Sequence, residues 1–300
     1  MRSVTWPLVR AQIRWALRRL DREPTVVAAS HSRDVLGRWG EGVVNVLYGT
    51  DDWVAGAVLM NQDPRRVLAE ERAAIARADL VLTVSGELAD RWRELGAAPI
   101  VFPNACDVHI YSRVAAAAPG AVPADLPTPV AGVVGQLSER IDARLLAAVA
   151  DTGMGLLLVG PLEPRWARRE LGDLLARPNV HHVGPVPFEE IPRWLARIDV
   201  GLTPYARSDF NRASFPLKTL EYLAAGLPVV STDLPASRKI SEQTDQLWVA
   251  ADTGGFVSAI RKAAAARREP ELVRARLAVA ARYSWEARAL QFAQLTGLHG

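Results

Sequence analysis

The chain has 300 residues, of which 49% are hydrophobic and 23% charged, and its formal net charge at pH 7 is +3. This length suffices for two domains with a large buried core, and the composition is that of a soluble globular protein. Basic residues are scattered among acidic ones, so nucleic-acid binding is not favoured. The single cysteine, Cys106, excludes an intramolecular disulfide and a cysteine-cluster metal site, and it indicates a reducing cytoplasm. The sequence shows no secretory signal and no apolar run of membrane-spanning length.

The first predicted element is a helix over residues 6–20. Its apolar positions lie on one side, and Arg10, Arg14 and Arg18 line another face. Such a basic amphipathic helix could rest on an anionic membrane surface, or it could cover a sheet with its arginine stems lying over apolar surface. We favour the second interpretation. The apolar positions are Trp6, Val9, Ile13, Leu17 and Leu20.

Short apolar runs then alternate with helical stretches, which predicts a parallel sheet with covering helices. Only about four strands precede residue 113, fewer than a usual doubly wound domain contains. Residues 114–129 are rich in Ala and Pro without periodicity and are the best candidate for a linker. The predicted strands are 26–29, 43–48, 80–84 and 100–102, and the predicted helices are 64–77 and 87–95.

A second series of alternating strands and helices follows the linker, so the chain is predicted to hold two α/β domains in tandem. Its predicted strands are 130–134, 155–159, 180–183, 200–203 and 229–232. Its predicted helices are near 142–150, 189–197, 216–225, 255–266, 271–282 and 285–295.

The most informative stretch is the predicted helix 216–225 and the strand after it. Pro216 suits the first helical position and Gly226 the position just past the end. Lys218, Glu221 and Tyr222 share one face, above a helix start without acidic residues, and a helix start of this kind favours anions. The alternative is a solvated Lys–Glu pair on an ordinary amphipathic helix.

Further candidates lie at predicted strand ends of the second domain. Gly135 ends the strand 130–134, where a glycine allows close approach of a phosphate, although the pattern is not GxGxxG. Arg140 could reach a diphosphate or could simply be a surface arginine beside Glu139. Tyr205 follows strand 200–203 at the carboxyl edge, where α/β sheets bind ligands.

In the first domain, Asp51 and Asp52 follow the strand 43–48 and precede Trp53. One of them could be a general base whose pKa is raised by burial or by its neighbour. An N-cap role is the alternative, and a metal site is the least favoured because no partner carboxylate or histidine cluster is visible.

These segments resemble a known family. PLKTLEYLAAGLPVVST, preceded by DVGLTPY and NVHHVGPVPFEEIPRWLARID, resembles the nucleotide-sugar half of GT-B glycosyltransferases. It is similar to family 4-like enzymes of bacterial cell-surface polysaccharide synthesis, including teichuronic-acid and glucuronosyltransferase types. LYGTDDW, ADLVLTVSGELADR and FPNACDV resemble the acceptor half of the same group.

The resemblance implies an α/β GT-B fold with two Rossmann-like domains, whose parallel sheets face each other across a cleft. The first domain would comprise 1–113 with a last helix, 285–300, crossing back to it, and 130–284 would bind the nucleotide sugar. By position, Glu221 would accept hydrogen bonds from the ribose. Lys218 with Arg140 would stabilise the diphosphate, Tyr222 would shape the pocket, and Asp51 or Asp52 would be the base of an inverting enzyme.

The family pattern also implies the reaction, which is transfer of a hexosyl or uronosyl group from a nucleoside-diphosphate sugar to a polysaccharide or lipid-linked acceptor. No cofactor and no obligatory metal are implied, and the enzyme is expected in the cytoplasm, at the inner face of the membrane. Ala213 stands where many members keep a glutamate, so inversion and retention both stay open. Compared with the family pattern, this sequence lacks the opening strand and glycine-rich loop of the first domain, so we expect either a true start further upstream or a truncated paralogue. The alternatives to the transferase are a catalytically inactive nucleotide-binding or partner protein and a GT-B epimerase or phosphorylase.

Overall fold

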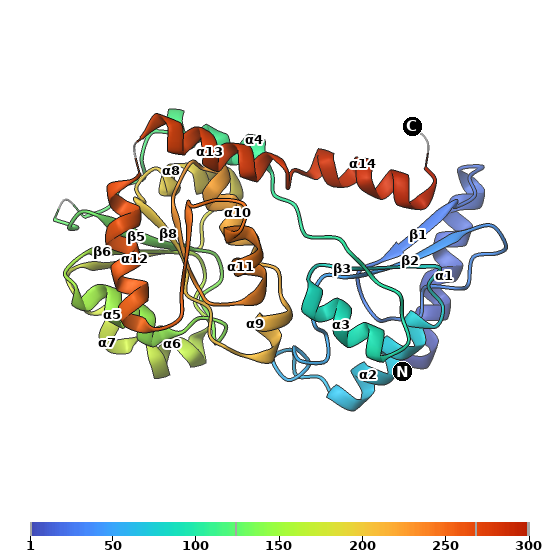
Figure 1. Cartoon of the computed structure of the whole chain (residues 1–300). Helices are drawn as coiled ribbons and strands as arrows, with labels where there is room; N and C mark the ends of the chain where they lie inside the picture. Colours follow the sequence, from blue (N-terminus) through green and yellow to red (C-terminus); the bar gives the residue numbers. More distant parts are fainter. Residues whose placement is uncertain (1, 124, 268, 299–300) are drawn as a thin grey trace. The chain divides into compact units, whose positions relative to one another are not determined.

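The computed structural model describes residues 2–123, 125–267 and 269–298, and the chain forms two compact units. The first unit comprises Met1–Asn104, Ala213–Phe215 and Leu290–Gly300. The second comprises Ala105–Arg212 and Pro216–Ala289. Each unit contains its own parallel sheet (Figure 1).

The sheet of the first unit has the strand order β1-β2-β3-β4 within the described residues, with all neighbours parallel. Side chains alternate between its faces, as the two-residue period of a strand requires. Leu47 and Val81 pack with α2 and α3 on one face, whereas Val46 and Leu82 pack with α14 on the other. The elements of this unit are α1 (Arg2–Arg19), β1 (Val26–Ala29), β2 (Val44–Gly49), α2 (Pro64–Ile75), β3 (Leu80–Thr83), α3 (Gly86–Glu94), β4 (Ile100–Val101) and most of α14 (Trp285–Thr296).

Helix α1 differs from the sheet-covering helix that we favoured from the sequence. Arg10 is buried and bonds to Asp34, and Trp6 stacks near His31, so the helix packs on the loop after β1. Ile13 and Leu20, expected on the covered side, are 40% and 68% exposed. Apolar residues therefore stand on solvent-facing positions of this helix as well as on its packed side.

The second unit has a six-stranded parallel sheet in the order β10-β9-β8-β5-β6-β7. Strands β5 and β6 are buried along their whole length, which explains their uninterrupted apolar sequences. Helices α5, α7 and α12 cover one face, and α10 and α11 lie on the other (Figure 1).

The second unit contains more elements than the first. Its strands are β5 (Val130–Val134), β6 (Gly155–Val159), β7 (Val180–Gly184), β8 (Val200–Thr203), β9 (Val229–Thr232) and β10 (Leu247–Ala250). Its helices are α4 (Val108–Ser112), α5 (Ala143–Asp151), α6 (Pro164–Glu170), α7 (Gly172–Leu175), α8 (Ile191–Leu195), α9 (Asp209–Ala213), α10 (Leu217–Ala224), α11 (Pro235–Ser241), α12 (Thr253–Ala265) and α13 (Pro270–Ala281), with 3₁₀ turns at Arg113–Ala116 and Phe188–Glu190.

The nine predicted strands coincide with β1 to β9 to within one residue at each end, and β10 was not predicted. The two units divide at residue 104 instead of the expected 113, because α4 packs against α10 and α13 of the second unit. Residues 114–123 and 125–129, expected as a linker, are likewise part of the second unit. Among the described residues, no helix is both long and apolar enough to cross a membrane.

Candidate functional site

Helix α10 lies at the carboxyl end of the second sheet, next to a cavity of about 220 Å³. The carboxyl ends of β5 and β8 form the cavity wall, which is the edge where open parallel sheets bind ligands. Five of the predicted nucleotide-sugar residues line it: Gly135, Arg140, Tyr205, Lys218 and Tyr222. The structure therefore brings together residues that the sequence places up to 87 positions apart.

Helix α10 begins and ends at residues that suit a helix boundary. At its start, Pro216 occupies the N-cap position, and its side chain makes no cap hydrogen bond. At its end, Gly226 takes a φ of +74°, which favours glycine. The buried guanidinium of Arg276 donates to the Gly226 carbonyl at 2.9 Å and also to the carbonyls of Ala266 and Arg267 after α12.

Gly135 has a φ of +134°, a conformation that L side chains rarely adopt. A Cβ atom there would lie 3.0 Å from Cε of Lys218, so the glycine leaves room for the lysine side chain. Its backbone N–H donates to the carbonyl of Val159 at 2.8 Å, which ties the turn to β6. The glycine thus allows Lys218 to reach the wall of the cavity.

Lys218 and Glu221 form an ion pair, with Nζ donating to Oε2 at 2.6 Å. Glu221 is only 7% exposed, so this is not the solvated surface pair that was the alternative interpretation of the helix. Glu221 lies behind Lys218 and is not part of the cavity wall itself. Lys218 therefore lines the cavity itself and at the same time binds the carboxylate of Glu221.

Tyr222 forms part of the cavity wall and is 1% exposed. The backbone N–H of Val134 donates to its hydroxyl oxygen at 2.8 Å. The ring packs against Gly201 of β8 so closely that a Cβ there would lie 2.4 Å from Cγ of the ring. Burial raises the pKa of Tyr222, and the hydroxyl keeps a proton that it can donate.

Arg140 is held in place by neighbours from the segment after β8. Its Nε donates to Oδ1 of Asn211 at 3.2 Å, and Asn211 donates back to the carbonyl of Arg140 at 2.9 Å. The guanidinium lies 4.8 Å from the ring centre of Phe210 and 5.6 Å from that of Tyr205. These contacts orient the guanidinium beside the cavity instead of leaving it as a loose surface arginine.

The charge of the cavity is unbalanced. Lys218 and Arg140 line it, and no carboxylate of the described residues does. Two cations beside a glycine turn at a strand's carboxyl end form an arrangement that binds a phosphate group. The sequence analysis did not single out Thr203, which is 1% exposed, lines the cavity and has no hydrogen-bond partner for its hydroxyl among the described residues. Its position directly before Pro204-Tyr205 is the signal that could have identified it.

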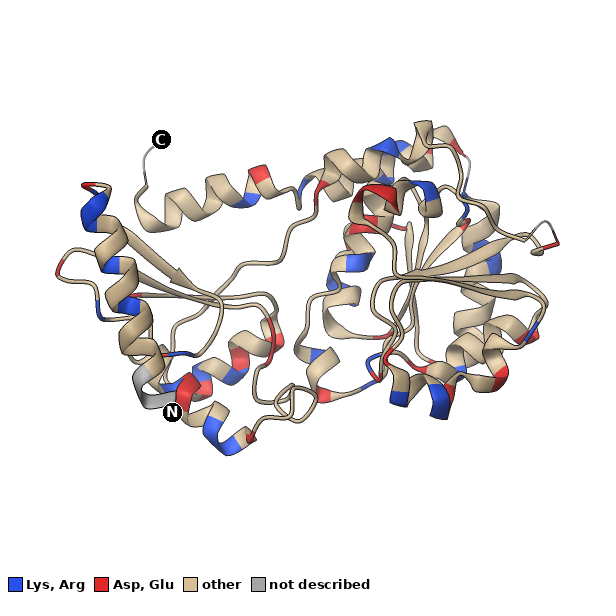
Figure 2. Cartoon of the chain, turned by 180° about the vertical axis from the view of Figure 1, so that it is seen from behind, with Lys and Arg blue, Asp and Glu red and all other residues tan. Residues whose placement is uncertain are grey.

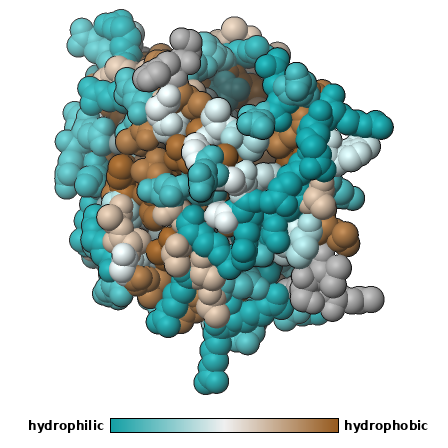
Figure 3. Space-filling model, turned by 90° about the vertical axis from the view of Figure 1, so that its right-hand side faces the viewer, coloured by the Kyte–Doolittle hydropathy of each residue, from teal (hydrophilic) through white to brown (hydrophobic). Residues whose placement is uncertain are grey.

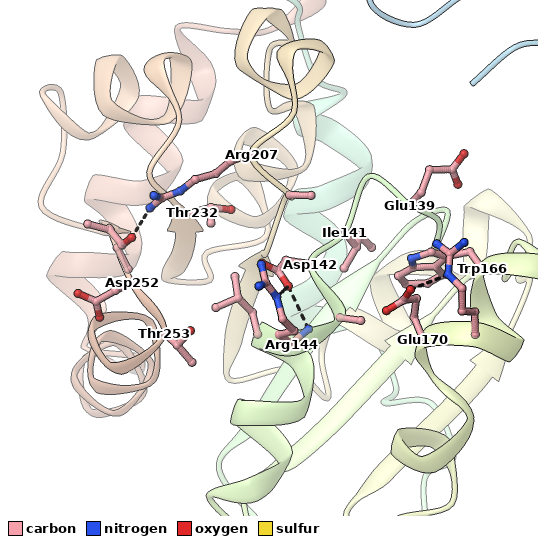
Figure 4. A pocket seen from close by; sticks show the side chains of 16 residues that line it. Glu139, Ile141, Asp142, Arg144, Trp166, Glu170, Arg207, Thr232, Asp252 and Thr253 are labelled. Carbon is pink, nitrogen blue, oxygen red and sulfur yellow. Dashed lines mark hydrogen bonds and ion pairs between the residues drawn. The ribbon is translucent and has the colours of Figure 1, made fainter. Parts of the chain in front are cut away.

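A larger cavity of about 430 Å³ lies at the same sheet edge, near the starts of α5 and α12 (Figure 4). Its three arginines have partners within its own wall. Arg144 pairs with Asp142 at 2.9 Å and Arg169 with Glu170 at 2.7 Å, while Arg207 bonds to the carbonyl of Ala251. Four carboxylates also line this cavity, whereas no carboxylate of the described residues lines the smaller one, so the smaller cavity is the better candidate for an anionic ligand.

The structure distinguishes the two aspartates that follow β2. Asp52 is 5% exposed and its Oδ1 accepts the N–H groups of Val54 and Ala55 at 3.1 and 3.0 Å. Its Oδ2 pairs with Arg91 at 3.0 Å. Asp52 therefore caps a turn and not the next helix, α2, whose N-cap is Asp63, and Asp51 is half-buried.

Arg91 links Asp52 to a second buried carboxylate. Glu71 is 0% exposed and accepts two hydrogen bonds from Arg91 at 2.6 and 2.7 Å. Burial opposes the charge of Arg91, but the bonds to Glu71 and the charges of Glu71 and Asp52 outweigh it and raise the pKa of Arg91. This network stabilises the first unit and engages Asp52 further. Within the part of the chain that the structure describes, no group of three or more His, Cys, Asp or Glu residues is arranged to hold a metal ion.

Several solved structures share the fold of this chain. The GT-B fold is shared with sucrose-phosphate synthase of Thermosynechococcus elongatus, with a TM-score of 0.73 and 21% identity over 97% of this chain and 77% of that one. HepE of Anabaena in complex with UDP matches with a TM-score of 0.65 and 16% identity over 85% and 72%. WaaG, a glycosyltransferase involved in lipopolysaccharide biosynthesis, matches at 0.63 and 16% over 94% and 81%.

Residues 128–266 match the family model described as glycosyl transferases group 1. The candidate cavity lies within the segment that matches this family model. Over 172 residues the chain is 31% identical to TuaH of Bacillus subtilis (strain 168), named for a glycosyltransferase of teichuronic acid biosynthesis. The match covers 56% of this chain and 43% of TuaH, so the chain spans less than half the length of that relative.

Proposed function

We propose that this protein is a glycosyltransferase whose second unit binds a nucleoside-diphosphate sugar. The observation that carries the proposal is the cavity at the ends of β5 and β8, lined by Lys218 and Arg140 and by no carboxylate among the described residues. It lies in the segment that matches group 1 glycosyltransferases. Related folds were solved with UDP and with UDP-glucose, so a uridine nucleotide is the first ligand to test.

In this proposal, Lys218 and Arg140 neutralise the diphosphate as it becomes the leaving group. Glu221 accepts hydrogen bonds from the ribose, Gly135 allows the phosphates close to the backbone, and Tyr222 closes the wall. Because two fixed cations supply the positive charge, we propose that the reaction proceeds without an obligatory metal or cofactor.

We also propose finer assignments, which the name of one relative supports. The transferred group is a hexosyl or uronosyl residue, and the acceptor is a cell-surface polysaccharide or a lipid-linked glycan, in line with the teichuronic acid role in the name of TuaH. We propose the cytoplasm as the compartment, since the free thiol of Cys106 is buried and the chain offers it no disulfide partner.

We propose Asp51 as the general base toward the acceptor hydroxyl, because the carboxylate of Asp52 is already occupied by two N–H groups and Arg91. Asp51→Asn is then expected to lower kcat by about 100-fold or more. Asp52→Asn is expected mainly to lower the free energy of unfolding, because it weakens the cap and the ion pair with Arg91. A fully active Asp51→Asn variant would exclude Asp51 as the base.

The donor site is tested by calorimetric titration with UDP, ADP and GDP. Lys218→Met should weaken the preferred nucleotide by about tenfold or more, since a charge-assisted contact to the diphosphate is lost. Lys262→Met, an exposed position on α12, is the matched control and should bind like the wild type. Equal affinity of the Lys218→Met variant and the wild type would refute this donor site.

Contact of α1 with an anionic membrane surface completes the proposal. Figure 2 shows basic residues along this helix, and its range Arg2–Arg19 contains no acidic residue. Leu8 and Trp15 are 58% and 53% exposed, and the face of the first unit in Figure 3 carries apolar surface beside hydrophilic side chains. We expect the protein to sediment with vesicles that contain anionic lipid, and Trp15→Glu to reduce this binding. Zwitterionic vesicles should bind neither the wild type nor the variant. Equal binding of both vesicle types would contradict it.

A further inference from the structure

Glu221 is surrounded by proton donors in addition to Lys218. Its negative charge helps to raise the pKa of Tyr111, Cys106 and Tyr222, after burial as the main cause, so these groups all lie near its carboxylate. Lys218 donates from Nζ to Oε2 of Glu221 at 2.6 Å. The carboxylate of Glu221 is thus buried near a tyrosine hydroxyl, and the ammonium of Lys218 compensates its negative charge.

Tyr111 is held rigidly next to this carboxylate. It belongs to α4, whose start is capped by Asp107 through the N–H groups of His109 and Ile110 at 3.1 Å. Helix α4 packs against α10, and the ring of Tyr111 meets that of Phe188 edge-on at 6.3 Å. The side chain is 2% exposed, so its hydroxyl has little freedom to turn away from Glu221.

The hydroxyl of Tyr111 completes no hydrogen bond with any described residue. A buried hydroxyl without a partner is destabilising, and a phenylalanine would fill the same space without that loss. Burial, and after it an interaction with the Glu221 carboxylate, raises the pKa of Tyr111, but the hydroxyl does not reach full hydrogen-bond geometry with any described residue while Lys218 holds the carboxylate. The geometry therefore points to a bond that is completed when Lys218 leaves.

A diphosphate bound in the cavity would attract the ammonium of Lys218 away from Glu221, because Lys218 lines the cavity. As its ammonium turns toward the phosphates, Glu221 would be left as a buried charge without a cation, which is strongly unfavourable. A hydrogen bond from a neutral donor to a carboxylate is among the stronger ones, so Tyr111 is suited to replace the lysine.

We propose that Tyr111 is a positioning residue that replaces Lys218 as the hydrogen-bond partner of the Glu221 carboxylate when a nucleoside diphosphate binds. The hydroxyl of Tyr111 donates to the carboxylate, and Glu221, held in this way, accepts the ribose hydroxyls while Lys218 serves the diphosphate. This inference rests on the proposed donor site and adds to it an exchange of partners within the second unit. It also makes the affinity for a nucleotide depend on a residue of α4.

The test is a pair of titrations with UDP, or with whichever of ADP and GDP the wild type prefers. Tyr111→Phe keeps the ring and its contact with Phe188, and it should raise the Kd about tenfold. In the Glu221→Gln background the same change should raise the Kd less than twofold, because the amide carries no charge that needs a replacement partner. Tyr283→Phe, which removes a hydroxyl that accepts a bond from Gln243, is the control and should leave the Kd unchanged.

Thermal unfolding of the free protein separates this role from a merely structural one. Since the hydroxyl of Tyr111 has no bond in the ligand-free chain, Tyr111→Phe should unfold at the wild-type temperature or slightly above it. If the wild type binds nucleotide and Tyr111→Phe binds it equally well, this inference is overturned, whereas the proposed donor site is not. A loss of affinity of the same size in both backgrounds would also overturn it. A wild type that binds no nucleoside diphosphate would overturn both.

Discussion

Tyr222→Phe tests the claim that the tyrosine hydroxyl closes the wall of the donor cavity. Tyr222 and Val134 are 1% and 4% exposed, and the N–H of Val134 donates to the hydroxyl at 2.8 Å. Removing the hydroxyl leaves a buried N–H group without its acceptor, which costs about 1–3 kcal/mol. The ring stays, so no cavity term is added. For a unit of this size, a loss of about 2 kcal/mol lowers the unfolding midpoint by about 4–8 °C.

The assay is calorimetric or fluorescence-detected thermal unfolding, with urea unfolding at 25 °C as the second measurement. Tyr205→Phe is the control, because Tyr205 lines the same cavity and no backbone N–H of the described residues donates to its hydroxyl. That variant should stay within about 0.5 kcal/mol of the wild type. A loss below about 0.5 kcal/mol for Tyr222→Phe would show that the N–H of Val134 finds another acceptor, and the assigned role of the hydroxyl would be refuted.

Three further predictions concern the second unit. Burial raises the pKa of Cys106 to about 12 from 9.0, so above pH 9 the thiol ionises in the unfolded chain first. The stability advantage of the wild type over Cys106→Ser should therefore shrink by about 1.4 kcal/mol per pH unit above 9, measured by urea unfolding at pH 8.5 and 10, and a constant difference would contradict this. Arg276→Met removes five hydrogen bonds to buried oxygens and should destabilise the fold by about 3–5 kcal/mol in urea; wild-type stability would show that those oxygens find other donors. Gly201→Ala presses a methyl group into the ring of Tyr222 and should cost about 1–3 kcal/mol and weaken nucleotide binding, whereas Gly172→Ala, with open space around it, should do neither.

The sequence predicts much of the second unit because local signals there agree with the tertiary structure. Val130–Val134 and Gly155–Val159 are short apolar runs, and both become fully buried parallel strands. Pro216 and Gly226 bound α10 in the sequence and also in the structure, where the glycine adopts a positive φ. The helical period places Lys218 and Glu221 on one face, and they do meet.

The remaining features depend on contacts that no local pattern records. Strand β10 (Leu247–Ala250) is four residues long and is stabilised by pairing with β9, so its own sequence is ambiguous. Asp52 and Asp51 are equivalent in sequence, and only the folded turn at Val54–Ala55 and the position of Arg91 on α3 show that Asp52 makes the cap and the ion pair. Tyr111 lies in a five-residue helix, and its proximity to Glu221 follows from the packing of α4 on α10.

The core of the first unit has a consequence for biosynthesis. Phe292 and Leu295 of α14 cover the face of the sheet formed by Val46, Leu82 and Phe102, although some 190 or more residues lie between them. A chain leaving the ribosome makes the strands of this sheet before the second unit but synthesises the covering helix α14 only after most of the second unit. The second unit can complete most of its packing while that face is still open, so we expect the first unit to fold after translation and to be the part that chaperones bind.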